Sequence, residues 1–409
     1  MYLYYTHNLF GTCVNRVSRW VLSDANVASG EVLLLDRIHS TAGNHNGGDL
    51  QFGNDGHLYV SVGDGGCDYA ATSNCGGAND AARDRHVLLG KILRITREPG
   101  VVPADNPFVG ARSGPCHATG STTPGTWCQQ TFAWGFRNPF RMAFDPNAAG
   151  TRLYVNDVGQ SSWEEIDDVR PGADYGWNVR EGHCARGSTT NCGPPPAGMT
   201  NPVFDYGRAD GCGSITGGAF VPAGVWPAAF DGGYLFSDFN CGRIFRLDPN
   251  GAGGFTRTDF ATGLGSSSAV HLAFGPWNGS QALYYTTYAS GGQVRRIATT
   301  TVEVIEGATF FTDGSSAKTV PSGTQVSVFA TRASPGVTYR LVSGRPDPTT
   351  GAACSVDAHP VNPVVRYATN EGILAITAGT VNRPPGDWQV CFLAIDRVAA
   401  TGPARLTVT

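Results

Sequence analysis

One motif recurs along the first three quarters of the chain and constrains its fold more than any other feature. The motif is a short strand-like run with a Leu-Tyr or similar pair, then a loop, then a second run that ends in Arg-Ile or a similar pair. The five copies of the first run are YLYY (2–5), LYVSV (58–62), LYV (153–155), YLF (234–236) and LYY (283–285). Short strands that recur at irregular intervals, joined by turns rich in Asp, Asn and Gly, are typical of β-propeller blades. Five copies of one hairpin pattern weigh against a stacked sandwich, so we expect an all-β fold built of propeller blades.

Composition agrees with this expectation and excludes several kinds of partner. The 409 residues include 55 Gly and 25 Pro, which suits many short strands better than long helices. Only 15% of the residues are charged, two are lysine, and the net charge is −4, so no electrostatic surface for nucleic acid is expected. The longest apolar run, 219–230, is interrupted by two prolines and a glycine. We therefore predict no nucleic-acid partner and no membrane span.

The sequence pattern changes near residue 300. The runs that end in arginine stop there, and alternating strands such as 325–329 and 388–393 follow. About a hundred residues with several strands and one candidate disulfide are typical of an immunoglobulin-like β-sandwich. We predict two domains: a β-propeller over residues 1–300, and an immunoglobulin-like accessory or binding module over residues 301–409.

The eleven cysteines indicate an oxidising compartment. Most of them lie in polar, Gly-rich stretches at spacings that suit small disulfide-closed loops, and no CxxC pair or His-rich partner indicates zinc. The expected pairs, which leave Cys13 over, are Cys67 with Cys75, Cys116 with Cys128, Cys184 with Cys192, Cys212 with Cys241, and Cys354 with Cys391. We therefore predict a secreted or periplasmic protein. No signal peptide precedes the first strand-like run, so we expect the beginning of the chain to be missing.

Three segments concentrate residues that can do chemistry. In 44–50 (NHNGGDL), His45 precedes paired glycines on a tight loop, where an imidazole can serve as a base, although a lone loop histidine usually has no such role. In 134–141 (WGFRNPFR), Arg137 offers a forked cation beside an amide, suited to an oxyanion or a carbonyl cofactor; capping a blade edge is the alternative. In 156–177, acidic residues are interleaved with glycines, which together offer the hard oxygen ligands that calcium prefers; a solvated turn is the alternative.

Taken together and in order, five segments resemble the soluble glucose/sorbosone dehydrogenase family, the PQQ-dependent aldose sugar dehydrogenases. The segments are HNGG (45–48), LYVSVGDGG (58–66), GKILRI (90–95), FRNPFR (136–141) and YGW (175–177). The resemblance covers roughly residues 1 to 300. Each motif is weak alone, but the ordered set is specific.

The resemblance implies a six-bladed β-propeller that holds PQQ and calcium and oxidises the anomeric hydroxyl of an aldose to a lactone. His45 would take the proton of that hydroxyl as a hydride passes to the quinone, and Arg137 with Asn138 would contact the quinone oxygens. Calcium would polarise the quinone as a Lewis acid. The positions that match calcium ligands are Gly159 and Gln160, through their backbone carbonyls, and Glu165 and Tyr175.

The chain departs from the family pattern in two ways. It shows five units where the family has six blades, and the family's opening blade does not precede Met1. Either the sequence is a piece of a longer protein, or the ring closes differently here. The cations that hold the three PQQ carboxylates in well-studied members match Asn240, Ser268 and Val270 here. Losing three charge-assisted hydrogen bonds of about 1.5–3 kcal/mol each would abolish tight binding. Replacement cations would have to come from other arginines, such as Arg141, Arg208 or Arg243.

Three functions follow from these observations. The first is a calcium-dependent quinoprotein sugar dehydrogenase, with a sugar as substrate and a separate electron acceptor. The second is a non-catalytic, calcium-containing propeller that binds a protein or a glycan, as the hedgehog-interacting type of propeller does. The third is a calcium-dependent lactonase. We place the dehydrogenase first because a pure binding scaffold has no need of a base. The sequence does not indicate an oligomeric state.

Overall fold

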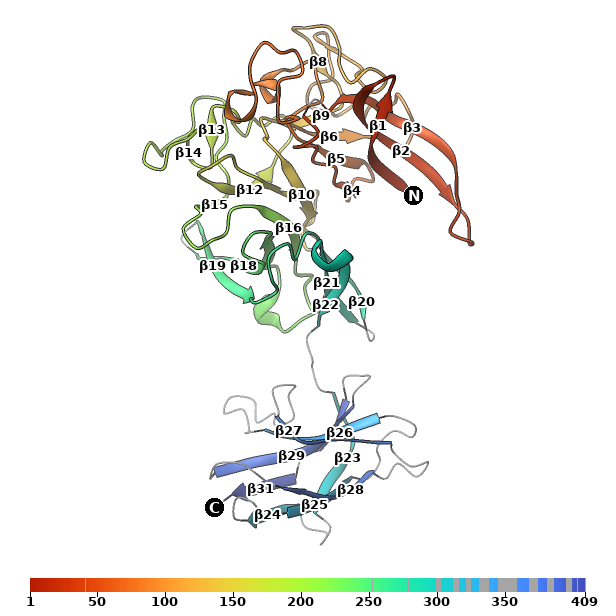
Figure 1. Cartoon of the computed structure of the whole chain (residues 1–409), viewed down its shortest axis with the longest axis vertical. Coiled ribbons are helices and arrows are strands. Elements are labelled where there is room, and N and C mark those ends of the chain that lie inside the picture. Colours follow the sequence, from red (N-terminus) through yellow and green to blue (C-terminus); the bar gives the residue numbers. More distant parts are fainter. Residues whose placement is uncertain are drawn as a thin grey trace. The chain divides into compact units, whose positions relative to one another are not determined.

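The computed structural model describes residues 1–40, 42–251, 253–277 and 280–298, together with strands that lie between residues 303 and 408 (Figure 1). The chain divides into two compact units. One comprises Met1–Gly275 and Gln281–Ile297, and the other comprises Pro276–Ser280 and Ala298–Thr409.

Five antiparallel sheets follow one another along the described part of the first unit, each built from strands that are near neighbours in sequence. In chain order these sheets are β1 (Tyr2–Leu9), β2 (Thr12–Leu22) and β3 (Ala28–His39); β4 (Leu50–Phe52), β5 (Leu58–Val62), β6 (Lys91–Ile95) and β9 (Thr131–Trp134); β10 (Pro139–Phe144), β11 (Leu153–Asp157), β12 (Glu164–Val169) and β15 (Phe204–Tyr206); β16 (Ile215–Phe220), β17 (Tyr234–Asp238), β18 (Arg243–Pro249) and β19 (Phe255–Ala261); β20 (Leu272–Trp277), β21 (Ser280–Thr287) and β22 (Gln293–Ile297). Two short pairs lie in the connections: β7 (Ser113–Gly114) with β8 (Trp127–Cys128), and β13 (Arg180–Glu181) with β14 (Cys184–Ala185).

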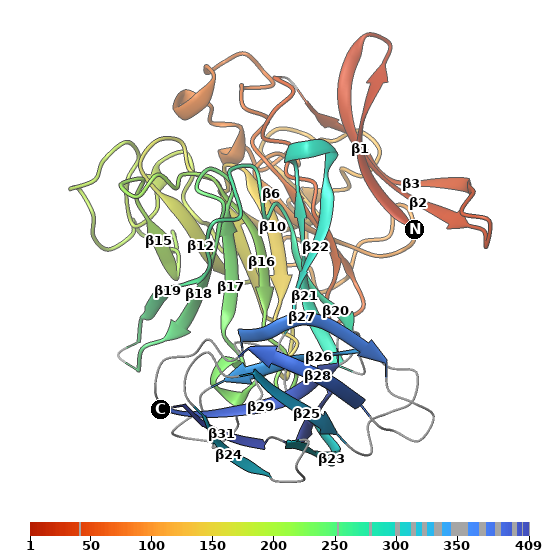
Figure 2. The ribbon, with the colours of Figure 1, turned by 60° about the horizontal axis from the view of Figure 1, so that its bottom comes forward.

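The repeated runs of the sequence are the strands β1, β5, β11, β17 and β21. Residues along the whole length of β5, β11 and β17 are buried, as expected for strands covered on both faces. Between sheets, β10 packs against β5 on one side and against β16 on the other. Figure 2 shows β10, β16 and β17 side by side in the first unit. The first strand of a sheet therefore lies against the neighbouring sheets.

The tyrosine of the repeated Leu-Tyr pair explains how successive sheets hold together. Tyr59, Tyr154 and Tyr234 are each only 1% exposed. The ring of Tyr59 packs edge-on against Phe144 of the next sheet, with 5.0 Å between ring centroids. The ring of Tyr154 packs in the same way against Tyr234 of the following sheet, at 5.0 Å, and also contacts Phe220. Such aromatic pairs contribute about 0.5–1.5 kcal/mol each beyond the area that they bury.

The second unit is described here by its backbone. Its strands are β23 (Glu303–Phe311), β24 (Ala317–Val320), β25 (Gln325–Ala330), β26 (Thr338–Gly344), β27 (His359–Tyr367), β28 (Leu374–Thr380), β29 (Gly386–Ala394), β30 (Ala399–Gly402) and β31 (Ala404–Val408). They pair in the order β24-β31-β29-β30-β23-β25-β28, and β26 pairs with β27 and β29. An immunoglobulin-like topology stays a prediction. The expected Cys354–Cys391 pair involves Cys354, which lies outside the described residues.

Helical structure in the described residues is limited to four 3₁₀ turns: η1 (Gly76–Ala78), η2 (Ala81–Arg83), η3 (Ala228–Phe230) and η4 (Ala289–Gly291). In this part of the chain, no helix has both the length and the apolar character that crossing a membrane requires.

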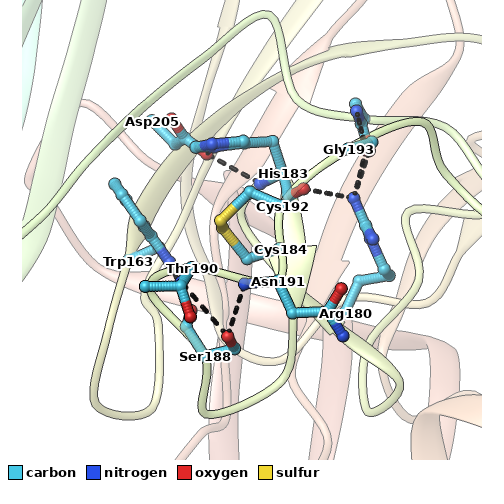
Figure 3. Close-up of a disulfide and its surroundings, with 11 residues drawn as sticks. Trp163, Arg180, His183, Cys184, Ser188, Thr190, Asn191, Cys192, Gly193 and Asp205 are labelled. Atoms are coloured by element: carbon cyan, nitrogen blue, oxygen red, sulfur yellow. Dashed lines mark hydrogen bonds and ion pairs between the residues drawn. A yellow bond between two sulfur atoms is a disulfide. The ribbon is translucent and has the colours of Figure 1, made fainter.

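Four of the predicted disulfides are confirmed, and Cys13 is exposed and unpaired, as expected. The disulfides are Cys67–Cys75, Cys116–Cys128, Cys184–Cys192 and Cys212–Cys241. Figure 3 shows Cys184–Cys192 beside the ion pair between His183 and Asp205. Disulfides of this kind are kept in oxidising compartments.

Lys91 makes a contribution to the stability of the fold that depends on pH. Its ammonium group is fully buried at the start of β6 and donates to the carbonyls of Leu89 (2.6 Å) and Ala82 (2.9 Å). Burial lowers the pKa of Lys91 from 10.5 to about 7. Between these two values the unfolded chain binds more protons than the folded chain, so this group makes stability rise with pH.

We therefore expect the free energy of unfolding of the wild type, relative to Lys91→Met, to increase from pH 7 to pH 9.5. The slope is at most about 1.4 kcal/mol per pH unit, the value for one proton. Urea unfolding at several pH values measures it, and Leu93→Met in the same strand controls for packing changes. Parallel pH profiles for the wild type and Lys91→Met would contradict the prediction.

Candidate functional site

Three loops from successive parts of the first unit bring an imidazole, a carboxylate and a guanidinium together. His45 follows β3, Asp64 follows β5, and Arg137 lies between β9 and β10. The His45 Nδ1 atom is 2.7 Å from Asp64 Oδ1, and the Arg137 Nη2 atom is 3.1 Å from His45 Nε2. The structure therefore places together the two residues to which the sequence assigned the chemistry, although 91 residues separate them.

These contacts favour one tautomer of the His45 ring. Arg137 is a donor only, so its Nη2–H donates to His45 and the Nε2 atom of His45 must carry a lone pair. The Nδ1–H then donates to the carboxylate of Asp64. This is the neutral tautomer that a general base requires, with its basic nitrogen directed at Arg137.

Asp64 is the residue that the sequence analysis missed. Its side chain is fully buried and accepts three hydrogen bonds: from His45, from the backbone N–H of Gly66 (2.8 Å) and from the indole N–H of Trp177 (2.8 Å). Asp64 and Trp177 both stand in segments that carried the family resemblance. The available signal was a carboxylate followed by paired glycines. Its partner, His45, lies 19 residues earlier in the sequence, so the spacing did not reveal the contact.

Close backbone packing fixes the His45 loop. His45 itself has a left-handed conformation, with φ of +47°. Its carbonyl oxygen lies so near Gly63 that a Cβ atom there would be 2.0 Å from it. Because any larger residue at position 63 would displace the loop, glycine is required at this close approach.

Arg137 uses all five of its N–H donors within the protein. Nη1 donates to the carbonyls of Val158 (2.8 Å) and Gly159 (2.9 Å), and Nε donates to the Gln160 side chain (3.1 Å). Nη2 donates to the same Gln160 oxygen (2.8 Å) and to His45. Burial lowers the pKa of Arg137, although four nearby carboxylates oppose this, and the group remains cationic. The guanidinium is therefore held in one orientation.

Asn138 borders a cavity of about 280 Å³ next to this arrangement. A buried carboxylate, Asp157, accepts the backbone N–H groups of Arg137 (2.8 Å) and Asn138 (2.6 Å) and so fixes both residues. The residues that line the cavity are all uncharged: Asn138, Phe140, Val158, Ser214, Thr216, Phe239, Val270 and Tyr288.

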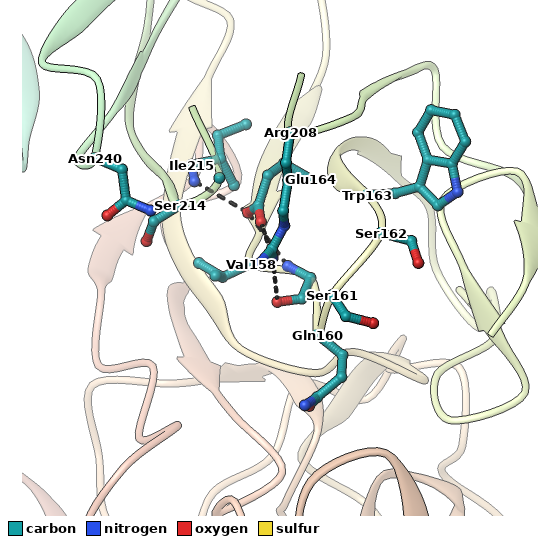
Figure 4. Close-up of polar contacts among 12 residues, drawn as sticks. Val158, Gln160, Ser161, Ser162, Trp163, Glu164, Arg208, Ser214, Ile215 and Asn240 are labelled. Carbon is teal, nitrogen blue, oxygen red and sulfur yellow. Dashed lines mark hydrogen bonds and ion pairs between the residues drawn. The ribbon is translucent and has the colours of Figure 1, made fainter. Parts of the chain in front are cut away.

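The three positions that match the carboxylate-binding cations lie around or near this cavity. Val270 lines it, and the hydroxyl of Ser268 donates to the carbonyl of Leu264 (2.8 Å). Asn240 lies near Ser214 (Figure 4). No positive charge comes from these three positions.

The predicted metal positions fall into two groups. The Gly159 carbonyl and the Gln160 side chain both accept hydrogen bonds from Arg137, and the Gly159 carbonyl also accepts one from Arg208 Nη2 (3.1 Å). Tyr175 is buried, and its hydroxyl donates to the carbonyl of Asp168 (2.6 Å). Glu165 belongs to a different cluster.

The acidic trio consists of Asp157, Glu165 and Asp167, whose carboxylates offer oxygens within 4.8 Å of one another. Asp157 and Glu165 are paired across β11 and β12, and Asp167 points to the same side of β12 as Glu165. All three are buried, and burial raises the pKa of each. Neither carboxylate oxygen of Asp167 has a hydrogen-bond partner among the described residues. This donor set fits a hard divalent cation such as calcium.

An all-β chain of successive antiparallel sheets, with a His-carboxylate pair beside a guanidinium, agrees with what comparisons with known proteins find. The family model of glucose/sorbosone dehydrogenases matches residues 1–265, and the chain belongs to this family. The all-β class and the family predicted from the sequence are thus confirmed.

Several relatives share part of the chain. The HIPL2 protein of Arabidopsis thaliana is 30% identical over 238 residues, which cover 51% of this chain and 31% of that protein. Aldose sugar dehydrogenase YliI of Escherichia coli (strain K12) is 30% identical over 140 residues, covering 34% and 30% respectively. The chain spans about a third of the length of these curated relatives.

Solved structures share the fold. A glucose dehydrogenase superposes with a TM-score of 0.57 at 21% identity, over 73% of this chain and 77% of that one. The PQQ-bound form of aldose sugar dehydrogenase from Streptomyces coelicolor superposes with a TM-score of 0.50 at 22% identity, over 72% and 73%. The number of blades stays a prediction, with five sheets of three or four strands in the described part of the first unit.

The geometry predicts the effect of Asp64→Asn. One amide oxygen cannot accept all three donors that now reach the two carboxylate oxygens, so at least one buried N–H loses its acceptor. We expect the free energy of unfolding to fall by about 1–3 kcal/mol and the His45 ring to lose its single tautomer. Denaturant unfolding and ¹⁵N chemical shifts of the imidazole measure these effects, with Asp84→Asn as the control. Unchanged His45 ring shifts would contradict the assignment.

Proposed function

We propose that this chain contains the catalytic domain of a sugar dehydrogenase, in which His45 takes the proton from the anomeric hydroxyl of an aldose. The observation that supports the proposal is the position of the His45 ring, whose Nδ1 atom is 2.7 Å from Asp64 Oδ1 and whose Nε2 atom is 3.1 Å from Arg137 Nη2. The product of this oxidation is a lactone, and a separate acceptor takes the electrons.

His45, Asp64 and Arg137 have distinct parts in the proposed reaction. A sugar hydroxyl would replace the Arg137 N–H at the Nε2 atom of His45, and this position is reachable because the His45 side chain is 13% exposed. The proton then moves from the hydroxyl oxygen to Nε2, and the carboxylate of Asp64 stabilises the imidazolium through Nδ1–H. The released Nη2–H of Arg137 is free to donate to an oxygen that gains negative charge.

The residues that would contact the quinone oxygens of PQQ are suited to it, whereas those that would contact its carboxylates are not. Arg137 and Asn138 would hold its quinone oxygens, and the cofactor when bound supplies the hydride acceptor. At the other end, Asn240, Ser268 and Val270 offer no charge to its carboxylates. PQQ therefore comes into the proposal through the family, as the group that would accept the hydride from the anomeric carbon while His45 takes the proton.

We further propose that the acidic trio, Asp157, Glu165 and Asp167, binds one calcium ion. Burying three carboxylates without a cation is costly, and Asp167 has no other partner among the described residues. Because Asp157 also holds the backbone of Arg137 and Asn138, the ion would stabilise the site indirectly. Tyr175 is not part of the proposed ligand set, because its hydroxyl donates to the carbonyl of Asp168 in β12.

The catalytic proposal predicts that His45→Ala lowers the rate of aldose oxidation by about 10²–10⁴-fold, the usual contribution of a general base. Dye reduction by the full chain with PQQ, calcium and a panel of aldoses measures the rate. PQQ binding, followed by absorbance, should stay within about twofold, because the ring is not needed to hold the cofactor. His57→Ala, on the turn before β5, is the control. A wild-type chain that is inactive under these conditions would overturn the proposal.

The calcium proposal predicts thermal stabilisation. At a calcium concentration of about 100 times Kd, the ion adds about 2.7 kcal/mol, which corresponds to a rise in Tm of about 4 °C for a unit of this size. Asp167→Asn should remove most of this rise. Asp168→Asn, its partly exposed neighbour on the opposite face of β12, should keep it. Scanning calorimetry with and without calcium compares the three proteins, and an equal rise in Asp167→Asn would place the ion elsewhere.

A second function is favoured by the uncharged lining of the cavity beside Asn138. A calcium-containing propeller that binds a protein or a glycan would need no cations for a cofactor. Calorimetry separates the two functions, because the binding protein would take up calcium but not PQQ.

The four disulfides support a secreted or periplasmic location for either function.

A further inference from the structure

The Gly159 carbonyl is the meeting point of two guanidinium groups. Arg137 Nη1 donates to it at 2.9 Å, and Arg208 Nη2 donates to it at 3.1 Å. Figure 4 shows Arg208 beside Glu164. A backbone carbonyl oxygen has two lone pairs, so these two hydrogen bonds use its accepting capacity. A divalent ion at this oxygen would have to displace one guanidinium and would be repelled by the other.

Arg208 is held at this carbonyl by a buried partner. Its Nη2 atom is also 2.6 Å from Oε1 of Glu164, whose side chain is completely buried. The other oxygen of Glu164 accepts the backbone N–H groups of Ile215 (3.1 Å) and Gly159 (3.3 Å). Glu164 therefore ties the peptide of Gly159 and the guanidinium of Arg208 into one hydrogen-bonded unit.

The carbonyl cannot easily turn away from the arginines. A Cβ atom on Gly159 would lie 1.6 Å from the carbonyl oxygen of Trp163, so the backbones approach closely here. Glu181 Oε1 accepts the next backbone N–H groups, those of Ser161 (2.7 Å) and Ser162 (2.8 Å). The loop that follows β11 is fixed from both sides.

Arg208 also has donors left for a ligand. Among the hydrogen bonds of the described residues, those of Arg208 use Nη2, which leaves Nε–H and the Nη1–H groups. Its side chain is 34% exposed. Val158, which precedes Gly159, and Ser214, which precedes the Glu164 partner Ile215, line the cavity beside Asn138.

We propose that Arg208 supplies the positive charge at the Gly159 carbonyl, in the place that the family resemblance gives to a cofactor calcium, and that its remaining donors bind an oxygen of the ligand. The inference rests on the proposed function for the nature of that ligand, an oxygen-rich anion of the PQQ type. The calcium of this chain is then confined to the acidic trio.

Calcium counting tests the inference without any assay of activity. In Asp167→Asn, which removes the acidic trio as a calcium site, we expect the full chain to bind no calcium by titration calorimetry. Adding Arg208→Gln frees a lone pair of Gly159 and removes one repelling cation, so the double variant should bind one calcium ion. Asp167→Asn with Arg170→Gln, where Arg170 is an exposed arginine after β12, is the matched control and should bind none.

Two results would overturn the inference. One is a calcium ion that remains in Asp167→Asn while Arg208 is present. The other is a double variant that binds no calcium, because the guanidinium would then not be what excludes the ion. If Asp167→Asn does not fold, the single variant Arg208→Gln tests the inference, because it should bind one more calcium ion per chain than the wild type.

PQQ titration separates this inference from the proposed function. In Asp167→Asn, the Kd for PQQ should be the same within twofold with and without calcium, and Arg208→Gln should weaken it at least tenfold in the absence of calcium. A wild-type chain that binds no PQQ would count against the proposed function, whereas the calcium counts would still decide on Arg208.

Discussion

A single buried carboxylate, that of Asp157, connects the framework of the first unit to its candidate site. It ends β11, accepts the two backbone N–H groups that set the position of Arg137 and Asn138, and faces Glu165 across the sheet. Without these two acceptor contacts, the loop before β10 would have unpaired N–H groups in a buried place, at a cost of about 1–3 kcal/mol each. The Asp157 carboxylate therefore both contributes charge to the acidic trio and sets the position of Arg137.

The site is organised before any ligand arrives. Arg137 has no idle donor, and His45 has one tautomer because Asp64 and Arg137 act on opposite sides of its ring. Organisation of this kind lowers the cost of reordering side chains during a reaction. It also means that a ligand can bind only by replacing existing hydrogen bonds. In the proposed reaction, the sugar hydroxyl would replace the hydrogen bond between Arg137 and His45.

The sequence predicted features that depend on local patterns. Repeated Leu-Tyr runs became strands because their period and their turns are local, and the disulfides within short loops followed from close spacing. His45 and Arg137 were found because the order of several motifs carried the family resemblance. The partners of these residues were harder to see. Asp64 and Trp177 act through contacts across 19 and 113 residues of chain, which leave no spacing pattern. Arg208 was a candidate cation from the sequence, but its contact with the Gly159 carbonyl leaves no such pattern either.

The Cys212–Cys241 disulfide has a consequence for where the protein can work. It joins the segment before β16 to the turn after β17, and Asp238 pins the same segment by accepting the N–H groups of Gly213 and Ser214. Ser214 in turn receives the N–H of Phe239 on its carbonyl, and both residues form part of the wall of the cavity. Reduction of this disulfide would remove the covalent tie between the two segments, so the shape of the cavity beside Asn138 depends on an oxidising environment.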